Sequence, residues 1–406
     1  MKIAIVEWAP RICGACDWGV HLSHGGADLG HEVDRLTFSK SGKALSAWGT
    51  KKDEWQPFRR ANAVEILNGY DLVILTDIAC RARVDGVDNR DGSMPYYVDV
   101  LKSLKTRWTT MIHDGAYNKR LLPVISESLG TDSFSGVLIT TRYPEAAPLV
   151  DPLSDRSVRW IVDPYLPYHV DPSFPTVPWG DKTHDLIFLG RLTSNKGQDA
   201  AIDLMDDLPA STGLHFWGMN AYGLPSWGWR MWELALERGW KPLRKPILRS
   251  DHANLKHPNA PKFYTGPFAV QSFSSQADKL IEYNGDFTSI ADVDWSPWIH
   301  LNLSNRSLTG TLEYTTLDAI AAGSVAVVPY HQLRYGNWPA VIGVGFTSYS
   351  ITKGGTWDRP GIISTLTGLL QGGNESFHEI AKAQHHELTA NHSPARILDT
   401  IIRRVS

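Results

Sequence analysis

Cysteine is scarce in this chain, with only Cys13, Cys16 and Cys80 among 406 residues. An odd and small number of cysteines argues against a disulfide framework and indicates a reducing compartment. Cys13 and Cys16 have the C-x-x-C spacing of zinc and redox sites, but zinc needs two further ligands and the chain has no second pair. We therefore predict no metal site.

Long hydrophobic runs are also missing. No stretch of about 18 apolar residues occurs, so we expect no membrane span. The first residues run directly into a strand pattern and lack the regions of a signal peptide. These absences, together with the few cysteines, predict a cytoplasmic protein.

Neither sign of charge dominates the chain. The formal net charge is −3, with 42% hydrophobic and 20% charged residues, which is typical of a soluble globular protein. A polyanion such as nucleic acid would therefore bind only at a local basic patch. A length of 406 residues favours two or three domains.

Short apolar segments alternate with helical ones along the first part of the chain. Met1–Trp8 is rich in Ile and Val, as expected of a strand buried in a parallel sheet. A glycine-containing loop at Arg11–Gly19 and a helix that ends at Gly30 follow it. The other predicted strands are Val33–Phe38, Asp71–Thr76, Trp108–His113, Gly136–Thr141 and Val158–Val162. This alternation predicts a doubly wound α/β sheet, which binds ligands at the carboxyl ends of its strands.

Prolines crowd into residues 163–183, and because proline is excluded from helix and strand interiors, we expect an interdomain linker there. The alternation then restarts, which predicts a second Rossmann-like domain. Its predicted strands are Asp185–Gly190, Gly213–Gly218, Trp298–Ser304 and Val325–Pro329, and its predicted helices are Lys196–Met205 and Tyr314–Ala322. We place the domains at 1–165 and 184–385, with a linker at 166–183 and a C-terminal helix at 386–406.

Residues 219–267 interrupt the second domain with a basic, tryptophan-rich insertion. Eight Lys or Arg residues lie from Arg230 to Lys262, against three acidic residues. Basic charge mixed with aromatic residues is typical of a nucleic-acid surface, and Arg230, Arg244, Lys245 and Arg249 are candidates for such contacts. The alternative is a solvated insertion whose tryptophans pack onto the domain.

Gly190–Gly197 follows a predicted strand and opens a predicted helix. A helix N-terminus offers unpaired N–H groups and partial positive charge, which suit a phosphate. Arg191 and Lys196 add two cations, which match the roughly two negative charges of a pyrophosphate without a metal. The alternative is an exposed helix start with incidental cations, but position, charge and glycine together favour a phosphate site.

Asp318 lies on the otherwise apolar helix at Tyr314–Ala322. A buried carboxylate there needs a partner, and a ribose diol could serve, as in dinucleotide-binding folds. The alternative is a partly exposed side chain without a ligand. Glu313 lies five residues earlier, near Asp318 but on a different stripe of the helix.

His113 and Asp114 end a predicted strand of the first domain, where side chains face the ligand crevice. They can orient a hydroxyl or stabilise developing positive charge, although a turn capped by Asp114 explains the pair equally well. The first loop, with Gly14, can offer backbone N–H groups to a phosphate or sugar. It lacks the G-x-G-x-x-G fingerprint, which argues against a dehydrogenase.

Two of these motifs resemble those of the retaining GT-B glycosyltransferases: a strand followed by G-R-L-x-x-x-K-G, and the helix L-D-A-x-A-x-G before another strand. The resemblance implies two Rossmann-like domains that face each other across a cleft, a UDP-sugar donor and no required cofactor. It assigns Arg191 and Lys196 to the donor diphosphate and Asp318 to the ribose. The family's second acid, which touches the donor sugar, falls on Gly310 here, and Glu313 is the nearest candidate to replace it.

A narrower resemblance is to the bacteriophage DNA α-glucosyltransferases that act on 5-hydroxymethylcytosine. Its residues are the first loop, Gly30–Val33, the His113–Asp114 pair and the stretch L-E-Y-T-T-L-D at Leu312–Asp318. It implies transfer of glucose from a UDP-sugar, with retention, to a hydroxymethylated pyrimidine of double-stranded DNA in the host cytoplasm. His113 and Asp114 are then catalytic, Gly14 helps to bind the diphosphate, the insertion binds DNA and the last helix braces the first domain.

Two other functions stay open. One is a GT-B glycosyltransferase that acts on a cell-surface or small-molecule acceptor. The other is a catalytically weak module that binds nucleotide or DNA, which the missing acid at Gly310 favours.

Overall fold

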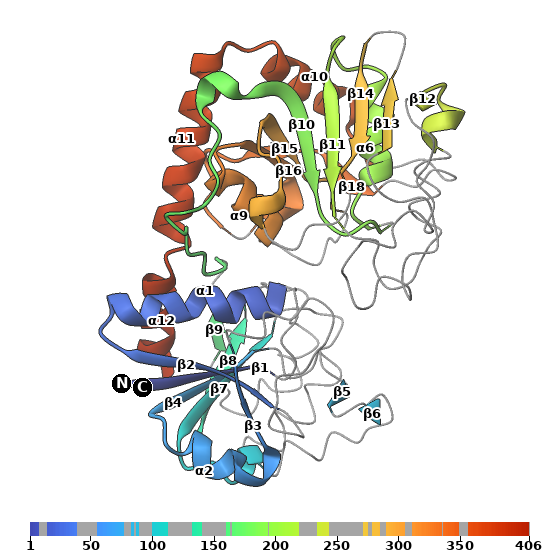
Figure 1. Ribbon diagram of the computed structural model, residues 1–406. Coiled ribbons are helices and arrows are strands. Elements are labelled where there is room, and N and C mark those ends of the chain that lie inside the picture. Colours follow the sequence, from blue (N-terminus) through green and yellow to red (C-terminus); the bar gives the residue numbers. More distant parts are fainter. Residues whose placement is uncertain are drawn as a thin grey trace. The chain divides into compact units, whose positions relative to one another are not determined.

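The computed structural model divides the chain into two units, which Figure 1 colours along the sequence. The first unit contains Met1–His169 and Thr389–Ser406 with the short segment Leu308–Thr311, and the second contains Val170–Ser307 and Leu312–Leu388. The structure describes residues 1–7, 14–38, 55–76, 83–84, 87–88, 100–112, 132–139, 160–162, 165–193, 195–218, 234–242, 271–274, 278–284, 290–304, 311–334, 336–348 and 356–405.

The first unit is built on a sheet of seven parallel strands. In sheet order they are β3 (Gln56–Phe58), β2 (Glu32–Phe38), β1 (Lys2–Glu7), β4 (Leu72–Leu75), β7 (Arg107–Ile112), β8 (Phe134–Ile139) and β9 (Trp160–Val162). The central strands β1 and β4 are buried on both faces, in keeping with their runs of Ile, Val and Leu. The strands predicted for this half are all present. Helices η2 (Arg60–Asn62) and α2 (Ala63–Leu67) and the hairpin β5 (Arg83–Val84) and β6 (Val87–Asp88) add to them.

Helix α1 (Gly14–Asp28) begins inside the stretch expected to be a loop, so the expectation of a loop up to Gly19 is wrong. Glycine commonly marks a loop, but Gly19 lies in the helix for a packing reason. A Cβ on Gly19 would stand 3.1 Å from the Trp55 ring and 3.2 Å from Ile5 of β1, closer than most real contacts. The missing side chain lets α1 lie tightly against the sheet.

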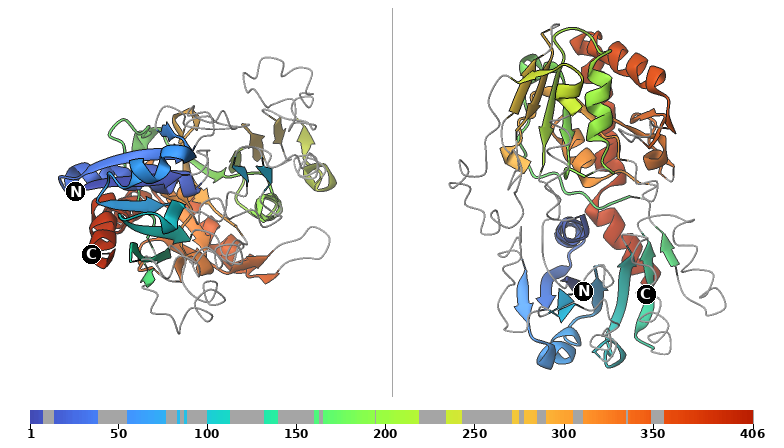
Figure 2. Two further views of the ribbon diagram at one scale, coloured as in Figure 1. Left: turned by 90° about the horizontal axis from the view of Figure 1, so that it is seen from below. Right: turned by 90° about the vertical axis from the view of Figure 1, so that its right-hand side faces the viewer.

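Helix α12 (Pro394–Val405) ends the chain but belongs to the first unit, where it packs along α1. Gly25 of α1 meets the backbone of Pro394 so closely that a side chain would not fit between them. The segment before α12 is also tied to this unit, because the His392 carbonyl accepts a hydrogen bond of 2.8 Å from the Tyr168 N–H. Figures 1 and 2 show both ends of the chain in this unit.

The second unit contains a sheet of eight strands. In sheet order they are β12 (Lys241–Pro242), β13 (Gln271–Ser274), β14 (Leu280–Tyr283), β11 (Gly213–Trp217), β10 (Thr183–Leu189), β15 (Pro297–Leu301), β16 (Val325–Pro329) and β17 (Ile342–Val344). The strands from β14 to β17 run parallel, and β13 and β12 extend the sheet antiparallel at one edge. A separate hairpin joins β18 (Phe346–Ser348) to β19 (Thr356–Trp357). The four strands predicted for this half are present at the centre of the sheet.

Helices cover both faces of the second sheet, as a doubly wound fold requires. One face buries alternate strand residues such as Leu186 and Phe188 under α6 (Gln198–Met205), α10 (Arg359–Leu370) and the start of α11 (Asn374–Asn391). The other buries Ile187 and Leu189 under α9 (Tyr314–Ala321) and the segment around η9 (Ile290–Asp292). Short 3-10 turns η7 (Trp179–Asp181) and η10 (Tyr330–Leu333) complete the unit. Among the described residues, no helix combines the length and apolar character needed to cross a membrane.

Within the predicted insertion 219–267, the structure describes residues 234–242. Trp240 is buried in the core of the second unit, and its indole N–H donates to Asp206 at 3.3 Å. Arg238 makes ion pairs with Asp203 and Asp206. In this stretch the packing interpretation therefore holds, whereas Arg230, Arg244, Lys245 and Arg249 lie outside the described residues.

Candidate functional site

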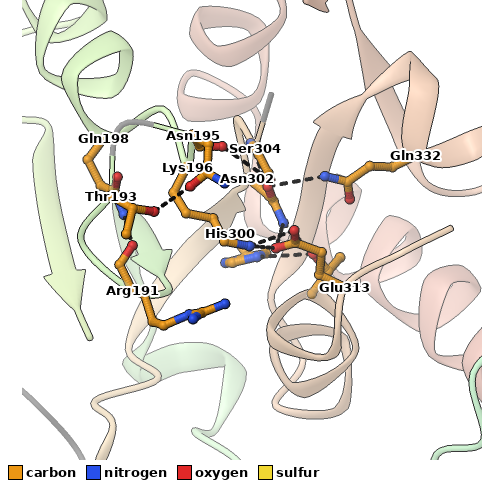
Figure 3. A network of polar contacts seen from close by, with 11 residues as sticks. Arg191, Thr193, Asn195, Lys196, Gln198, His300, Asn302, Ser304, Glu313 and Gln332 are labelled. Carbon is orange, nitrogen blue, oxygen red and sulfur yellow. Dashed lines mark hydrogen bonds and ion pairs between the residues drawn. The ribbon is translucent and has the colours of Figure 1, made fainter. Parts of the chain in front are cut away.

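The candidate site lies at the carboxyl edge of the second sheet, where β10, β15 and β16 end next to one another. Three segments leave this edge: the loop after β10 up to Gly197, the residues 302–304 after β15, and η10 after β16. The N-terminus of α9 joins them through Glu313. Figure 3 shows the polar side chains that these segments bring together. Parallel sheets bind ligands at this edge, so the location suits a binding site.

An ion pair between Lys196 and Glu313 forms the centre of the site. The ammonium of Lys196 donates to both carboxylate oxygens of Glu313, at 2.6 Å to Oε1 and 2.5 Å to Oε2. The two side chains are mostly buried, with 13% and 16% of their surface exposed. Glu313 is the residue before the first turn of α9, with extended backbone, yet its side chain does not cap the helix. The carboxylate turns instead to Lys196 on the neighbouring loop.

The Glu313 carboxylate is held as an anion. Burial raises its pKa, but the charge and hydrogen bonds of Lys196 outweigh burial, and with Ser304 and Asn302 they lower the pKa to about 2. The Asn302 side-chain amide donates to Oε2 at 3.3 Å. Glu313 is therefore ionised at every pH at which the protein is expected to work.

A buried chain of hydrogen bonds lies behind Glu313. The side-chain oxygen Oδ1 of Asn302 accepts from the Ser304 backbone N–H at 2.9 Å and from the Gln332 side-chain amide at 3.3 Å. The side-chain NH₂ group of Asn302 also donates to the Thr316 hydroxyl at 3.1 Å. Asn302, Ser304, Thr316 and Gln332 are all at most 3% exposed. Because Gln332 and Ser304 both donate to the oxygen of Asn302, its NH₂ group is left to face Glu313. These residues form a preset support for the carboxylate.

His300 of β15 lies beneath the same network. It is fully buried, and its Nε2 lies 3.4 Å from the Thr316 hydroxyl. Burial lowers the pKa of His300 to about 4 despite the nearby Glu313 charge, so the ring is neutral at neutral pH. We infer a packing and hydrogen-bonding role for it rather than a cationic one.

Arg191 sits on the loop that carries Lys196. Its carbonyl accepts a hydrogen bond of 2.7 Å from the side chain of Gln198, a fully buried residue of α6, which ties the loop to the helix. Further along, the Lys196 N–H donates to the Thr193 carbonyl at 3.0 Å. The half-buried Arg191 side chain points toward α9 in Figure 3. Both predicted phosphate-binding cations thus come from one short, internally bonded loop before α6.

The other predicted site residues are placed as follows. Asp318 lies in α9 and is half-buried, so burial alone does not demand a partner for its carboxylate, and its ribose role stays a prediction. Gly14 begins α1 in the first unit. His113 and Asp114 follow the end of β7 and lie outside the described residues. Within the described part of the chain, no group of His, Cys, Asp or Glu could hold a metal ion.

Sequence reasoning missed Asn302, Ser304, Thr316 and Gln332. A faint signal existed for the first two, because polar residues that follow an apolar strand face the ligand edge. Gln332 and Thr316 gave no such signal, since a single polar residue in a short turn or an amphipathic helix is ordinary. Their roles depend on which strands become neighbours.

The sequence matches no known family model and no curated protein. The structure, in contrast, resembles solved glycosyltransferases over its whole length. An α-glucosyltransferase (AGT) in complex with UDP is 13% identical, with a TM-score of 0.63 over 100% of this chain and 99% of that one. An α-glucosyltransferase in complex with UDP and a 13-mer DNA containing an HMU base is 12% identical, with a TM-score of 0.67 over the same shares. Anabaena Alr3699/HepE in complex with UDP and glucose is 10% identical, with a TM-score of 0.63 over 99% of this chain and 98% of that one.

These comparisons show the fold. The chain has the α/β architecture of GT-B glycosyltransferases, with two units each built on a sheet whose central strands are parallel, as the sequence predicted. The solved neighbours bind UDP, and one of them, an α-glucosyltransferase, was solved with UDP-glucose and DNA. How the two units face each other across a cleft, and which residues bind the donor, stay predictions.

Proposed function

We propose that this protein transfers glucose from UDP-glucose to a hydroxymethylated pyrimidine of double-stranded DNA, with retention of the anomeric configuration. The observation that carries the proposal is the Arg191–Lys196 loop at the carboxyl edge of the second sheet, in a chain with the fold of UDP-bound glucosyltransferases. The loop supplies two cations next to a helix start, where a diphosphate binds favourably. No cofactor is required.

The donor is proposed to bind mainly to the second unit. Arg191 and Lys196 would hold the diphosphate, with backbone N–H groups at Gly14 as a further contact, and Asp318 would accept hydrogen bonds from the ribose. Glu313 is the candidate for contact with the donor sugar. The GT-B fold and the motif resemblance both support this assignment.

The proposed transfer depends on stabilising the charges that develop as the bond to the donor sugar breaks. The bond between the anomeric carbon and the UDP oxygen breaks, and the acceptor hydroxyl bonds to that carbon on the same face. The departing diphosphate oxygen takes the acceptor's proton, while Arg191 and Lys196 stabilise the negative charge that develops on it. His113 and Asp114 would act beside the anomeric carbon, orienting the acceptor and stabilising positive charge.

DNA as acceptor requires that the modified base leaves the stack, at a cost of a few kcal/mol. Cations of the insertion, Arg230, Arg244, Lys245 and Arg249, would grip the phosphate backbone, and its aromatic residues would stack on bases. The similarity to DNA-bound α-glucosyltransferases supports this acceptor.

The proposal is tested with UDP-[¹⁴C]glucose and three matched duplexes, which carry 5-hydroxymethylcytosine, 5-hydroxymethyluracil or only unmodified bases. We expect label in at least one hydroxymethylated duplex and none in the unmodified one, and release of the label by an α-specific but not a β-specific glucosidase. Label released by the β-specific enzyme alone would disprove retention.

A second candidate function is transfer to a cell-surface or small-molecule acceptor, since the chain shares its fold with HepE, which was solved with UDP and glucose. Label that enters oligosaccharide acceptors and no DNA would establish this candidate instead. Tight UDP binding without turnover of UDP-glucose would indicate a catalytically weak binding module.

A further inference from the structure

A series of hydrogen-bonded side chains leads from the interior of the second unit to its ligand edge. Gln332 donates to Asn302 at 3.3 Å, Asn302 donates to Glu313 at 3.3 Å, and Lys196 donates to Glu313 from the other side (Figure 3). Gln332 and Asn302 are buried, whereas Lys196 and Glu313 reach the surface in part. The last member of this series is Lys196, one of the two cations assigned to the diphosphate.

We propose that Glu313 is a positioning residue, which orients the Lys196 ammonium toward the donor diphosphate and is itself held in place by Asn302 and Gln332. This inference rests on the proposed donor site. It gives Glu313 a role that does not require contact with the sugar, and it adds Gln332, which touches neither proposed substrate group, to the residues that set donor affinity.

Lys196 has a flexible side chain that needs a partner to fix it. A four-carbon stem gives the ammonium many positions, and fixing it on a ligand costs conformational entropy. Two hydrogen bonds to Glu313 fix the ammonium before the donor arrives. Asn302 restrains Glu313 in turn, because it donates to Oε2 while its own side-chain oxygen accepts from Ser304 and Gln332.

The negative charge of Glu313 also points to a positioning role. An anionic carboxylate beside a diphosphate repels it. Glu313 therefore lowers the donor affinity unless a second effect of the same carboxylate raises it. Together Lys196 and Glu313 carry no net charge. Lys196 then contributes a directed hydrogen-bond donor, and Arg191 contributes the net positive charge of the loop.

The two possible roles of Glu313 predict opposite effects on UDP, which has no sugar. If Glu313 only contacts the sugar or only neutralises Lys196, Glu313→Gln leaves UDP affinity unchanged or increases it. If Glu313 positions Lys196, the same substitution weakens UDP binding, and it does so only while Lys196 is present.

The test is a double-mutant cycle measured by titration calorimetry with UDP. We expect Glu313→Gln and Lys196→Met each to raise the Kd about tenfold, which corresponds to the loss of about one charge-assisted hydrogen bond. The double variant should bind no more weakly than Lys196→Met alone. Glu387→Gln is the matched control: this half-buried carboxyl of α11 accepts from the Ala340 N–H, and its loss should leave the Kd for UDP unchanged.

Gln332 provides an independent arm in case Glu313→Gln perturbs folding. Gln332→Leu should raise the Kd for UDP by a smaller factor, about threefold, and should have no further effect in the Lys196→Met background. A purely structural role for Gln332 would lower stability equally in both backgrounds without this dependence on Lys196.

Unchanged or tighter UDP binding by Glu313→Gln, or additive losses in the cycle, would overturn the inference and leave the donor site standing. A wild-type protein that binds neither UDP nor UDP-glucose would overturn the donor site and the inference together.

Discussion

The backbone of Gly218, just after β11, packs so closely on the carbonyl oxygen of Gly190, just after β10, that a side chain on Gly218 would clash with it. Both glycines have φ of +144°, which other residues rarely adopt. A backbone hydrogen bond of 3.0 Å from Gly190 to the Trp217 carbonyl locks the contact. The loop that carries Arg191 therefore starts from a fixed point at the sheet edge.

Replacing Gly218 tests that fixed point. Gly218→Ala should destabilise the protein by about 1–3 kcal/mol, because the methyl group clashes with backbone and the conformation is strained. UDP affinity should fall with it, since the Arg191 loop must shift. Gly368→Ala is the control: Gly368 lies within α10 with nothing in the way of a Cβ, and alanine there should stabilise by about 0.5–1 kcal/mol. Chemical denaturation of wild type and the two variants measures both changes in stability, and titration with UDP measures the affinity. An unchanged denaturation midpoint for Gly218→Ala would show that the close contact does not stabilise the fold.

The protonation of His215 should make stability depend on pH. Burial lowers the pKa of this β11 residue, but Asp185 and Glu282, on the strands to either side, outweigh burial and raise it to about 9. A raised pKa means that the stabilisation is complete below the unfolded value of about 6.5 and is lost as pH rises through 9. We expect a loss on the order of 3 kcal/mol between pH 6 and pH 10.

The matched variants are His215→Gln and, on exposed His386 of α11, His386→Gln. Thermal melts across this range should show the alkaline loss in wild type and His386→Gln and a much smaller one in His215→Gln. Parallel curves for all three proteins would mean that His215 is not the group responsible.

The ribose role of Asp318 predicts a preference among nucleotides. Wild type should bind UDP about tenfold more tightly than its 2′-deoxy or its 3′-deoxy analogue, because one hydrogen bond to the carboxylate is lost. The Asp318→Asn variant should bind UDP with about the same affinity as whichever of the two deoxy analogues binds weakly to wild type. A preference for the full diol that survives in Asp318→Asn would move the ribose contact to another residue.

Much of the fold was predictable because the central strands are continuous apolar runs whose alternation with helices has few solutions. β1, β4, β16 and the last four residues of β10 are buried on both faces, and each of these strands was predicted. The short β14 and the polar β13 lie toward one edge of the sheet, where neighbouring strands rather than composition decide strand formation. Gly19 was misleading because the same residue type serves loops and close helix packing.

The site was only half predictable. Arg191, Lys196 and Glu313 belong to local motifs, so the sequence places each at its strand or helix end. That Lys196 binds Glu313, 117 positions further on, follows from which strands are adjacent and from side-chain geometry, which no local pattern encodes. The local motifs accordingly predict separate ligand contacts for these two residues, whereas in the structure they form an ion pair.

The basic insertion predicts salt-dependent DNA binding. Replacing Arg230, Arg244, Lys245 and Arg249 together by serine should weaken binding to all duplexes alike and reduce the slope of log K against log salt by up to about 3.6. Arg238→Ser is the control, because that cation is already paired with Asp203 and Asp206. Fluorescence anisotropy from 50 to 200 mM salt measures the slopes, and equal slopes for all three proteins would exclude these residues from the DNA surface.

Binding of the donor diphosphate by the loop after β10 is tested by titrating UDP into wild type and Arg191→Ala and by measuring glucose transfer with the same preparations. We predict that Arg191→Ala melts at the wild-type temperature, binds UDP at least about tenfold more weakly and transfers no glucose. An Arg191→Ala protein that binds UDP as tightly as wild type and keeps full transfer would contradict it.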